Sequence, residues 1–102
     1  MPSITAILPA YNEEVSIGSV VLRARQHADR VIVVDDGSHD HTAEVAALAG
    51  AEVIRHGENR GKGAALRTGF AAADGADVIV TIDTDGQHSL AEASSSYAPD
   101  GA

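Results

Sequence analysis

Four short apolar runs, separated by three segments with helical periodicity, constrain the fold of this chain more than any other feature. The runs lie at residues 4–9, 31–34, 53–54 and 78–82, and the third is the weakest. A polar or glycine-rich stretch follows each of them. Strands that alternate with helices in this way predict a parallel sheet covered by helices. We therefore expect an α/β protein with a Rossmann-like layered fold.

Each predicted helix has one apolar face. These faces are formed by Ile17, Val20, Val21 and Ala24, by Val45, Leu48 and Ala49, and by Leu66, Gly69, Phe70 and Ala73. Asp40 is a residue type that caps helices, and it precedes the second helix. Gly50 is suited to end that helix in a left-handed conformation, and Asp74-Gly75 ends the third.

Size and composition limit the functions that the chain can have. With 102 residues, 44% of them hydrophobic, it can form one globular core. The absence of cysteine means that any metal is held by oxygen or imidazole ligands, which favours Mg²⁺ or Mn²⁺. A formal net charge of −8 with seven basic residues argues against nucleic-acid binding, which needs clustered Lys and Arg.

The ends of the sequence also carry predictions. No run approaches the ~20 apolar residues of a membrane span, and no charged segment precedes the first strand, so we expect a cytoplasmic protein. From Ser89 to Ala102 the sequence is rich in Ser, Ala, Gly and Asp without an apolar period. We therefore predict one domain over residues 1–88 and a low-complexity, disordered tail over 89–102.

Polar clusters follow three of the predicted strands. They are Tyr11-Asn12-Glu13-Glu14, Asp35-Asp36 and Asp83-Thr84-Asp85. Ligands of open parallel sheets bind beyond the carboxyl ends of the strands, where these clusters would converge. The sequence therefore predicts a binding site at this edge of the sheet.

The two acidic clusters each allow two interpretations. In an extended segment Asp83 and Asp85 point to the same side, so they can hold a divalent cation that binds a diphosphate. Asp35 and Asp36 can accept hydrogen bonds from a base or a ribose. Both clusters could instead be simple turns, since Asp and Gly favour turns.

The glycine-rich stretch at residues 57–63 is neither a Walker A motif nor a dinucleotide fingerprint. It has too few residues before Gly61-Lys62 for the first, and it lacks the third glycine of the second. It does place Arg60, Lys62 and Arg67 near a helix N-terminus, where an anion can bind. A solvated basic loop is the alternative interpretation.

Four motifs together resemble glycosyltransferase family 2, whose members have the GT-A fold. The motifs are Ile7-Leu8-Pro9-Ala10-Tyr11-Asn12-Glu13-Glu14, Val33-Val34-Asp35-Asp36-Gly37-Ser38, Asn59-Arg60-Gly61-Lys62-Gly63-Ala64-Ala65-Leu66-Arg67 and Asp83-Thr84-Asp85-Gly86-Gln87-His88. They occur in the family's order over residues 3–88. The last motif looks most like the branch that transfers mannose or glucose to polyprenyl or dolichyl phosphate.

The resemblance implies a role for each matching residue. Residues expected to bind the nucleotide sugar are Pro9, Tyr11, Glu13, Asp35, Asp36, Lys62, Arg67 and Asp83. Residues expected to bind the metal, Mg²⁺ or Mn²⁺, are Asp83, Asp85 and Gln87. No residue is assigned a catalytic role, because the family places any general base beyond the metal motif.

The implied reaction is inverting transfer of a hexose from a GDP- or UDP-sugar to an acceptor, for which a polyprenyl phosphate at the inner face of the membrane is a candidate. Members of the family continue after His88 with the acceptor side, so the resemblance also implies an incomplete GT-A fold. The alternative is a non-catalytic nucleotide-binding fragment. The exposed sheet edge of a half-domain would favour a homo-oligomer.

Overall fold

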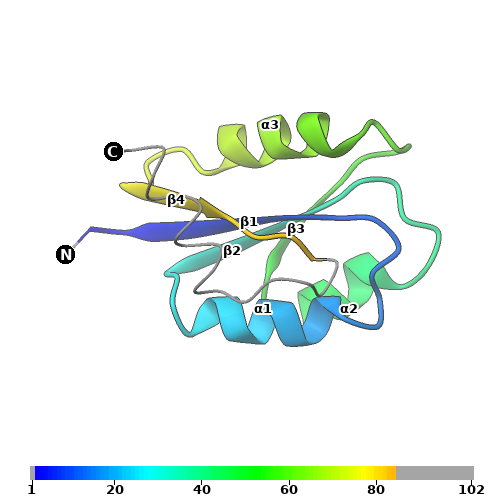
Figure 1. The fold of residues 1–102 in the computed structure, drawn as a ribbon, viewed down its shortest axis with the longest axis horizontal. Helices are drawn as coiled ribbons and strands as arrows, with labels where there is room; N and C mark the ends of the chain where they lie inside the picture. Colours follow the sequence, from blue (N-terminus) through cyan, green and yellow to red (C-terminus); the bar gives the residue numbers. More distant parts are fainter. Residues whose placement is uncertain (1, 85–102) are drawn as a thin grey trace.

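The computed structural model describes residues 2–84, and these form one parallel sheet with three helices (Figure 1). The strands are β1 (Ile4–Ala10), β2 (Arg30–Asp35), β3 (Glu52–Arg55) and β4 (Val78–Thr81). The helices are α1 (Ile17–Arg25), α2 (Thr42–Leu48) and α3 (Lys62–Ala72). The predicted alternation of strands and helices is therefore confirmed.

Strand β1 lies inside the sheet, whose order is β3-β2-β1-β4. It pairs in parallel with β2, where Ile7 is opposite Ile32, and with β4, where Ile7 is opposite Thr81. The carboxyl ends of β1, β2 and β4 consequently meet at one edge of the sheet. This is the edge at which the polar clusters were predicted to converge.

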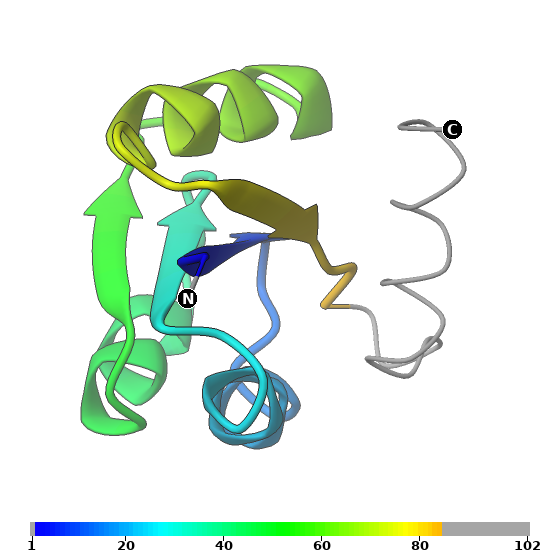
Figure 2. The ribbon, with the colours of Figure 1, turned by 90° about the vertical axis from the view of Figure 1, so that its left-hand side faces the viewer.

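Helices cover both faces of the sheet, as predicted (Figure 2). Alternate strand residues point to opposite faces, so Leu8 and Val33 pack with α1 and α2, whereas Ile7 and Ile32 pack with α3. All four side chains are fully buried. Burial of an aliphatic side chain of this size contributes roughly 1.5–3 kcal/mol, so these two layers provide the main stabilisation of the sheet.

Close packing of α3 against β1 depends on Gly69. A Cβ atom at this position would overlap the Cγ2 methyl of Ile7, which is bonded directly to Cβ of a fully buried side chain and so has no room to move away. Glycine therefore lets the helix lie directly on the strand, which brings the N-terminus of α3 to the carboxyl edge of the sheet.

Two predicted core positions are wrong. Leu48 is 88% exposed and Phe70 is 46% exposed. Helix α2 buries Thr42, Ala43 and Ala46 instead, so Leu48 at its last residue lies on the outward side. On α3 the sheet is contacted by the small residues, and Phe70 lies about 100° around the helix from Gly69.

The structure confirms the predicted end of α2 but not its predicted cap. The carboxylate Oδ1 of Asp40 accepts the backbone N–H of Thr42 at 2.9 Å, immediately before the first helical turn. After the helix, Gly50 has a φ of 105°, in the left-handed region that glycine favours. The N-cap position is His41, which makes no side-chain cap hydrogen bond, so the prediction that Asp40 caps the helix is wrong by one residue. Gly50 ends the helix as predicted.

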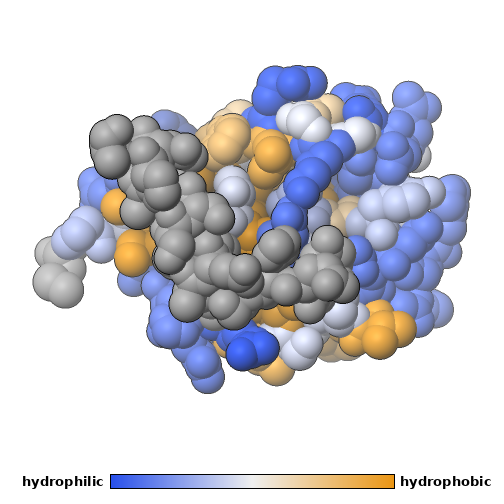
Figure 3. Space-filling model, in the orientation of Figure 1, coloured by the Kyte–Doolittle hydropathy of each residue, from blue (hydrophilic) through white to orange (hydrophobic). Residues whose placement is uncertain are grey.

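Most of the visible surface in Figure 3 is hydrophilic, with apolar residues in smaller patches. Within residues 2–84, no helix is long and apolar enough to cross a membrane. The predicted tail at 89–102, together with Asp85 and Gln87, lies outside the described residues.

Candidate functional site

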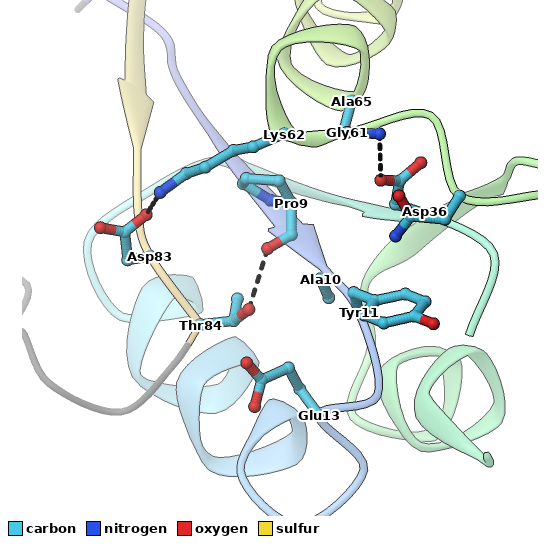
Figure 4. Close-up of a pocket in the computed structure, with 11 residues that line it drawn as sticks. Pro9, Ala10, Tyr11, Glu13, Asp36, Gly61, Lys62, Ala65, Asp83 and Thr84 are labelled. Atoms are coloured by element: carbon cyan, nitrogen blue, oxygen red, sulfur yellow. Dashed lines mark hydrogen bonds and ion pairs between the residues drawn. The ribbon is translucent and has the colours of Figure 1, made fainter. Parts of the chain in front are cut away.

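A pocket of about 330 Å³ lies at the carboxyl edge of the sheet, between the ends of β1, β2 and β4 and the N-terminus of α3 (Figure 4). It is lined by Pro9, Ala10, Tyr11, Glu13, Asp36, Asn59, Gly61, Lys62, Ala65, Asp83 and Thr84. The pocket has two distinct ends. Asp36 and Tyr11 lie on one side, and Lys62 and Asp83 lie on the other.

Six residues of the predicted nucleotide-sugar site line this pocket. They are Pro9, Tyr11, Glu13, Asp36, Lys62 and Asp83. Asp35 and Arg67 do not line it, and Asp85 and Gln87 lie beyond the described part of the chain. The other lining residues were not among the predicted site residues, although they belong to the motifs that suggested the site: Ala10, Asn59, Gly61, Ala65 and Thr84.

Asp36 is held rigidly at the base of the pocket. Its Oδ1 accepts the backbone N–H of Arg60, and its Oδ2 accepts that of Gly61, each at 2.9 Å. Its own backbone N–H donates to the carbonyl of Ala10 at 2.8 Å, next to the end of β1. Gly61 adopts a φ of 96°, a conformation that turns its N–H toward the carboxylate at little cost only for glycine.

The pKa of Asp36 is lower than that of an ordinary aspartate. Burial has the largest single influence and would raise this pKa, because it disfavours the charged form. Hydrogen bonds from the His56 ring and from the two backbone N–H groups, with the charge of His56, outweigh burial and stabilise the carboxylate. Asp36 is therefore an anionic acceptor over the physiological range.

His56 is a buried partner of Asp36 that no sequence pattern predicts. Its Nδ1 lies 2.8 Å from Asp36 Oδ1, and its Nε2 lies 2.8 Å from the hydroxyl of Thr68 on α3. The His56 side chain is only 7% exposed. A single histidine just after a weak strand carries no motif, so only the fold reveals this contact.

Asp35 lies on the opposite face of β2 from the pocket. Its Oδ1 accepts the backbone N–H of Ser38 at 3.1 Å, which fixes the turn after β2. Its Oδ2 is buried and makes no hydrogen bond within residues 2–84, but Arg55 Nε lies 3.5 Å away and compensates its charge. Asp35 therefore supports the loop that carries Asp36, although it was predicted among the residues that bind the nucleotide sugar.

The loop that carries Tyr11 and Glu13 is tied to the loop after β2. Ser38 Oγ accepts the backbone N–H of Asn12, and Thr42 Oγ1 accepts that of Glu13, both at 2.8 Å. In return, Asn12 Oδ1 accepts the N–H of His39 at 2.9 Å. Reciprocal bonds of this kind hold both loops in one arrangement and place the Tyr11 ring beside Asp36 (Figure 4).

Gly37 allows the loop after β2 to contact the loop before α3. Its φ is 78°, and a Cβ atom here would lie 2.5 Å from backbone atoms of Glu58 and Asn59. The loop after β2 therefore contacts the loop before α3 backbone to backbone. This contact explains why the N–H groups of residues 60 and 61 reach the Asp36 carboxylate.

The other end of the pocket is formed by Asp83 and Lys62. The Nζ of Lys62, the first residue of α3, is paired with Asp83 Oδ1. The Asp83 side chain is 35% exposed and that of Lys62 is 60% exposed. Next to them, Thr84 is buried and its hydroxyl donates to the carbonyl of Pro9 at 2.8 Å. This bond holds the segment after β4 against β1.

The described residues provide only part of a metal site. No group of three or more His, Cys, Asp or Glu side chains suited to a metal occurs within residues 2–84. Asp83 nevertheless places a hard oxygen ligand at the pocket, of the type that Mg²⁺ and Mn²⁺ prefer. Asp83 thus fits a divalent cation, provided that further ligands come from outside the described range.

The arrangement suits a ligand with an N–H-bearing aromatic ring at one end and an anion at the other. The Tyr11 ring offers stacking, and the Asp36 carboxylate offers a hydrogen-bond acceptor. At the far end, Lys62 and the N-terminus of α3 present positive charge. These are the features that a nucleoside diphosphate requires.

Comparison with known proteins agrees with this geometry. The family model of glycosyl transferase family 2 matches residues 5–92. UDP-N-acetylglucosamine–dolichyl-phosphate N-acetylglucosaminyltransferase of Methanococcus voltae is 39% identical, over 80% of this chain and 41% of its own length. Undecaprenyl-phosphate 4-deoxy-4-formamido-L-arabinose transferase of Aeromonas hydrophila is 35% identical, over 83% of this chain and 29% of its own length.

Solved structures of related proteins have the same fold as this chain. Glucosyl-3-phosphoglycerate synthase of Mycobacterium tuberculosis, in complex with Mn²⁺, UDP and glucosyl-3-phosphoglycerate, is 36% identical and superimposes with a TM-score of 0.72. The match covers 82% of this chain and 34% of that structure. The predicted GT-A fold is thereby confirmed.

The chain spans between 29% and 41% of the length of the relatives named above. The family match nevertheless covers most of the chain, and the pocket contains residues from all four predicted motifs. This chain belongs to glycosyl transferase family 2.

Proposed function

We propose that the pocket binds the nucleoside diphosphate of a UDP-sugar, and that the chain supplies the donor-binding part of an inverting hexosyltransferase. One observation carries the proposal. A rigid buried carboxylate beside an aromatic ring lies at one end of the pocket, and a lysine–carboxylate pair at a helix N-terminus lies at the other. A base and a diphosphate need these two environments at opposite ends of one site.

At the base end, the uracil ring stacks on Tyr11 and donates its imide N–H to Asp36. A carboxylate that is already bound by backbone N–H groups needs no reorganisation when it meets this donor. Pro9 and Glu13 line the wall between the two ends, where the ribose lies.

At the diphosphate end, Lys62 leaves Asp83 and binds phosphate oxygens. Lys62 is the first residue of an 11-residue helix, so the helix dipole adds to its charge. Arg67 lies about one and a half turns further along α3 and outside the pocket lining, so it contributes a longer-range attraction for the diphosphate.

Asp83, with Asp85 and Gln87, would hold the Mg²⁺ or Mn²⁺ ion. When bound, this ion neutralises the charge that develops on the departing diphosphate. The solved relative in complex with Mn²⁺, UDP and glucosyl-3-phosphoglycerate supports a divalent ion beside the nucleotide, and another of its structures contains Mg²⁺ and UDP.

The acceptor attacks the sugar from the face opposite the nucleotide, which inverts the anomeric centre. The dolichyl-phosphate and undecaprenyl-phosphate relatives favour a lipid phosphate as this acceptor. Such an acceptor is already ionised and needs no general base.

Thermal unfolding with added ligand tests the donor site. UDP at about 100 times its dissociation constant should stabilise the chain by roughly 2.7 kcal/mol, which is several degrees in Tm, and only with Mn²⁺ or Mg²⁺ present. The control is the chain with metal alone. A chain that unfolds cooperatively and is shifted by no nucleotide would refute the proposal.

Transfer itself is tested separately, because a binding fragment and an enzyme give the same thermal shift. The measurement is incorporation of labelled sugar from UDP-glucose or UDP-N-acetylglucosamine into polyprenyl phosphate. Metal-dependent binding without any transfer would favour the non-catalytic alternative.

A further inference from the structure

Behind the pocket, His56 links Asp36 on β2 to Thr68 on α3. Neither His56 nor Thr68 lines the pocket, yet both ring nitrogens of His56 lie 2.8 Å from their partners. The facing side chains of Asp36 and His56 are 6% and 7% exposed. The contact is therefore shielded from water and sets how the Asp36 carboxylate is oriented.

The hydrogen bonds of Asp36 leave it little spare capacity. A carboxylate has about four acceptor sites, two on each oxygen. Oδ1 is bound by His56 Nδ1 and by the N–H of Arg60, so both of its sites are used. Oδ2 is bound by the N–H of Gly61 alone. Within residues 2–84, Asp36 thus retains one acceptor site, on Oδ2.

Thr68 keeps His56 in the orientation that produces this pattern. The Thr68 hydroxyl can donate to a bare Nε2 or accept from a protonated one, and in both cases Nδ1 carries a proton for Asp36. Both ring nitrogens are then satisfied. Without the hydroxyl, the ring could rotate, and without the ring, Oδ1 would regain a site and the carboxylate could turn.

We propose that His56, oriented by Thr68, is a positioning residue that determines which base the site accepts. By occupying Oδ1, it leaves Asp36 with one acceptor. Uracil presents one imide N–H between two carbonyls and matches a single acceptor. Guanine presents an N–H and an amino group side by side, and these match a carboxylate with both oxygens open. This inference rests on the proposed function, since it assigns the base that the same pocket selects.

The test compares the affinities of UDP, GDP and pyrophosphate, each with Mn²⁺, by calorimetry. Wild type should prefer UDP to GDP by at least about tenfold, which corresponds to about 1.4 kcal/mol. His56→Phe keeps a ring but loses both nitrogens. It should lower the affinity for UDP about tenfold and reduce the ratio of UDP affinity to GDP affinity. The affinity for pyrophosphate should be unchanged. Thr68→Val should show the same pattern with a smaller loss.

A conservative variant and a distant control complete the design. An asparagine amide can take the place of Nδ1, so His56→Asn should recover most of the preference for UDP. His27 is exposed and far from the pocket in the sequence and the fold, so His27→Gln should bind all three ligands as wild type does. Circular dichroism verifies that each variant is folded.

The outcomes separate the two proposals. If wild type binds none of the three ligands, the proposed function itself fails. If wild type binds UDP but folded His56→Phe or Thr68→Val keeps the full preference over GDP, the positioning role is wrong. An equal loss for UDP and pyrophosphate would also overturn it, because a general structural defect would affect both. Should His56→Phe not fold, Thr68→Val decides the matter alone.

Discussion

The two carboxylates of the pocket are held in very different ways. Asp36 is buried and receives hydrogen bonds from a histidine ring and two backbone N–H groups. Asp83 is about one-third exposed, and the contact described for it is an ion pair with an exposed lysine. The first is part of the folded framework, whereas the second lies where solvent and ligand can reach it.

This difference indicates which end of the site is organised before a ligand arrives. The end around Asp36 needs no rearrangement, because loops after β1, β2 and β3 are bonded to one another there. At the other end, Lys62 and Asp83 neutralise each other, and under the proposed function they separate when phosphate and metal bind. We therefore expect the two carboxylates to respond differently to mutation and to pH.

Removal of each carboxylate should give the largest contrast. Asp36→Ala leaves His56 and two backbone N–H groups without their acceptor in a buried place, which should lower the free energy of unfolding by about 3 kcal/mol. Asp83→Ala removes a partly exposed ion pair and should lower the free energy of unfolding by less than about 1 kcal/mol. Urea unfolding of both variants measures the difference. Equal losses would mean that the two ends are organised alike.

Acid should reveal how much the buried carboxylate of Asp36 contributes to stability. The folded-state pKa of Asp36 is lowered, so its contribution to stability is present above its unfolded-state pKa and is lost as pH falls through the folded-state pKa. The stability difference between wild type and Asp36→Asn should therefore be constant near neutral pH and shrink in strong acid. Urea midpoints across this pH range measure it. A difference independent of pH would show that the charge of Asp36 is not what stabilises the loop.

The smallest expected effect on stability concerns Lys62. Lys62→Met removes the partner of Asp83 but keeps the length of the side chain. The free energy of unfolding should change by about 0.5 kcal/mol or less, since both groups are substantially exposed. The affinity for UDP with Mn²⁺ should nevertheless fall several-fold. If the free energy of unfolding fell as far as in Asp36→Ala, the Lys62–Asp83 ion pair would be part of the folded framework. The contrast drawn between Asp36 and Asp83 would then be wrong.

Much of this architecture could be predicted from the sequence, because the apolar runs and helix periodicity report burial directly. The position of Asp36 was predictable for the same reason, since it follows a continuous β-branched run. Leu48 was misplaced because a seven-residue helix turns its last residue outward while short side chains fill the interface. Phe70 was misplaced because Ala65 and Gly69 bring α3 so close to β1 that no large ring fits between them.

Side-chain contacts between residues that are distant in the sequence could not be predicted from a single sequence. His56 and Thr68 are 12 positions apart and become neighbours only when α3 packs on the sheet. Asp35 and Asp36 are adjacent in the sequence, and a strand sends them to opposite faces, so one lines the pocket and the other supports a turn. To decide which of the two carboxylates faces the pocket, one must know which helix covers each face of the sheet.

The strand order also has a consequence for how the site forms as the chain is synthesised. Strand β1 emerges first and pairs with β2, which lies about 25 positions later, but its other edge pairs with β4, about 74 positions later. The loops around Asp36 can therefore assemble while the last strand is still missing, whereas Asp83 joins the pocket only after the most distant contact closes. Under the proposed function, a nascent chain would form the end of the pocket that binds the base before the end that binds the diphosphate.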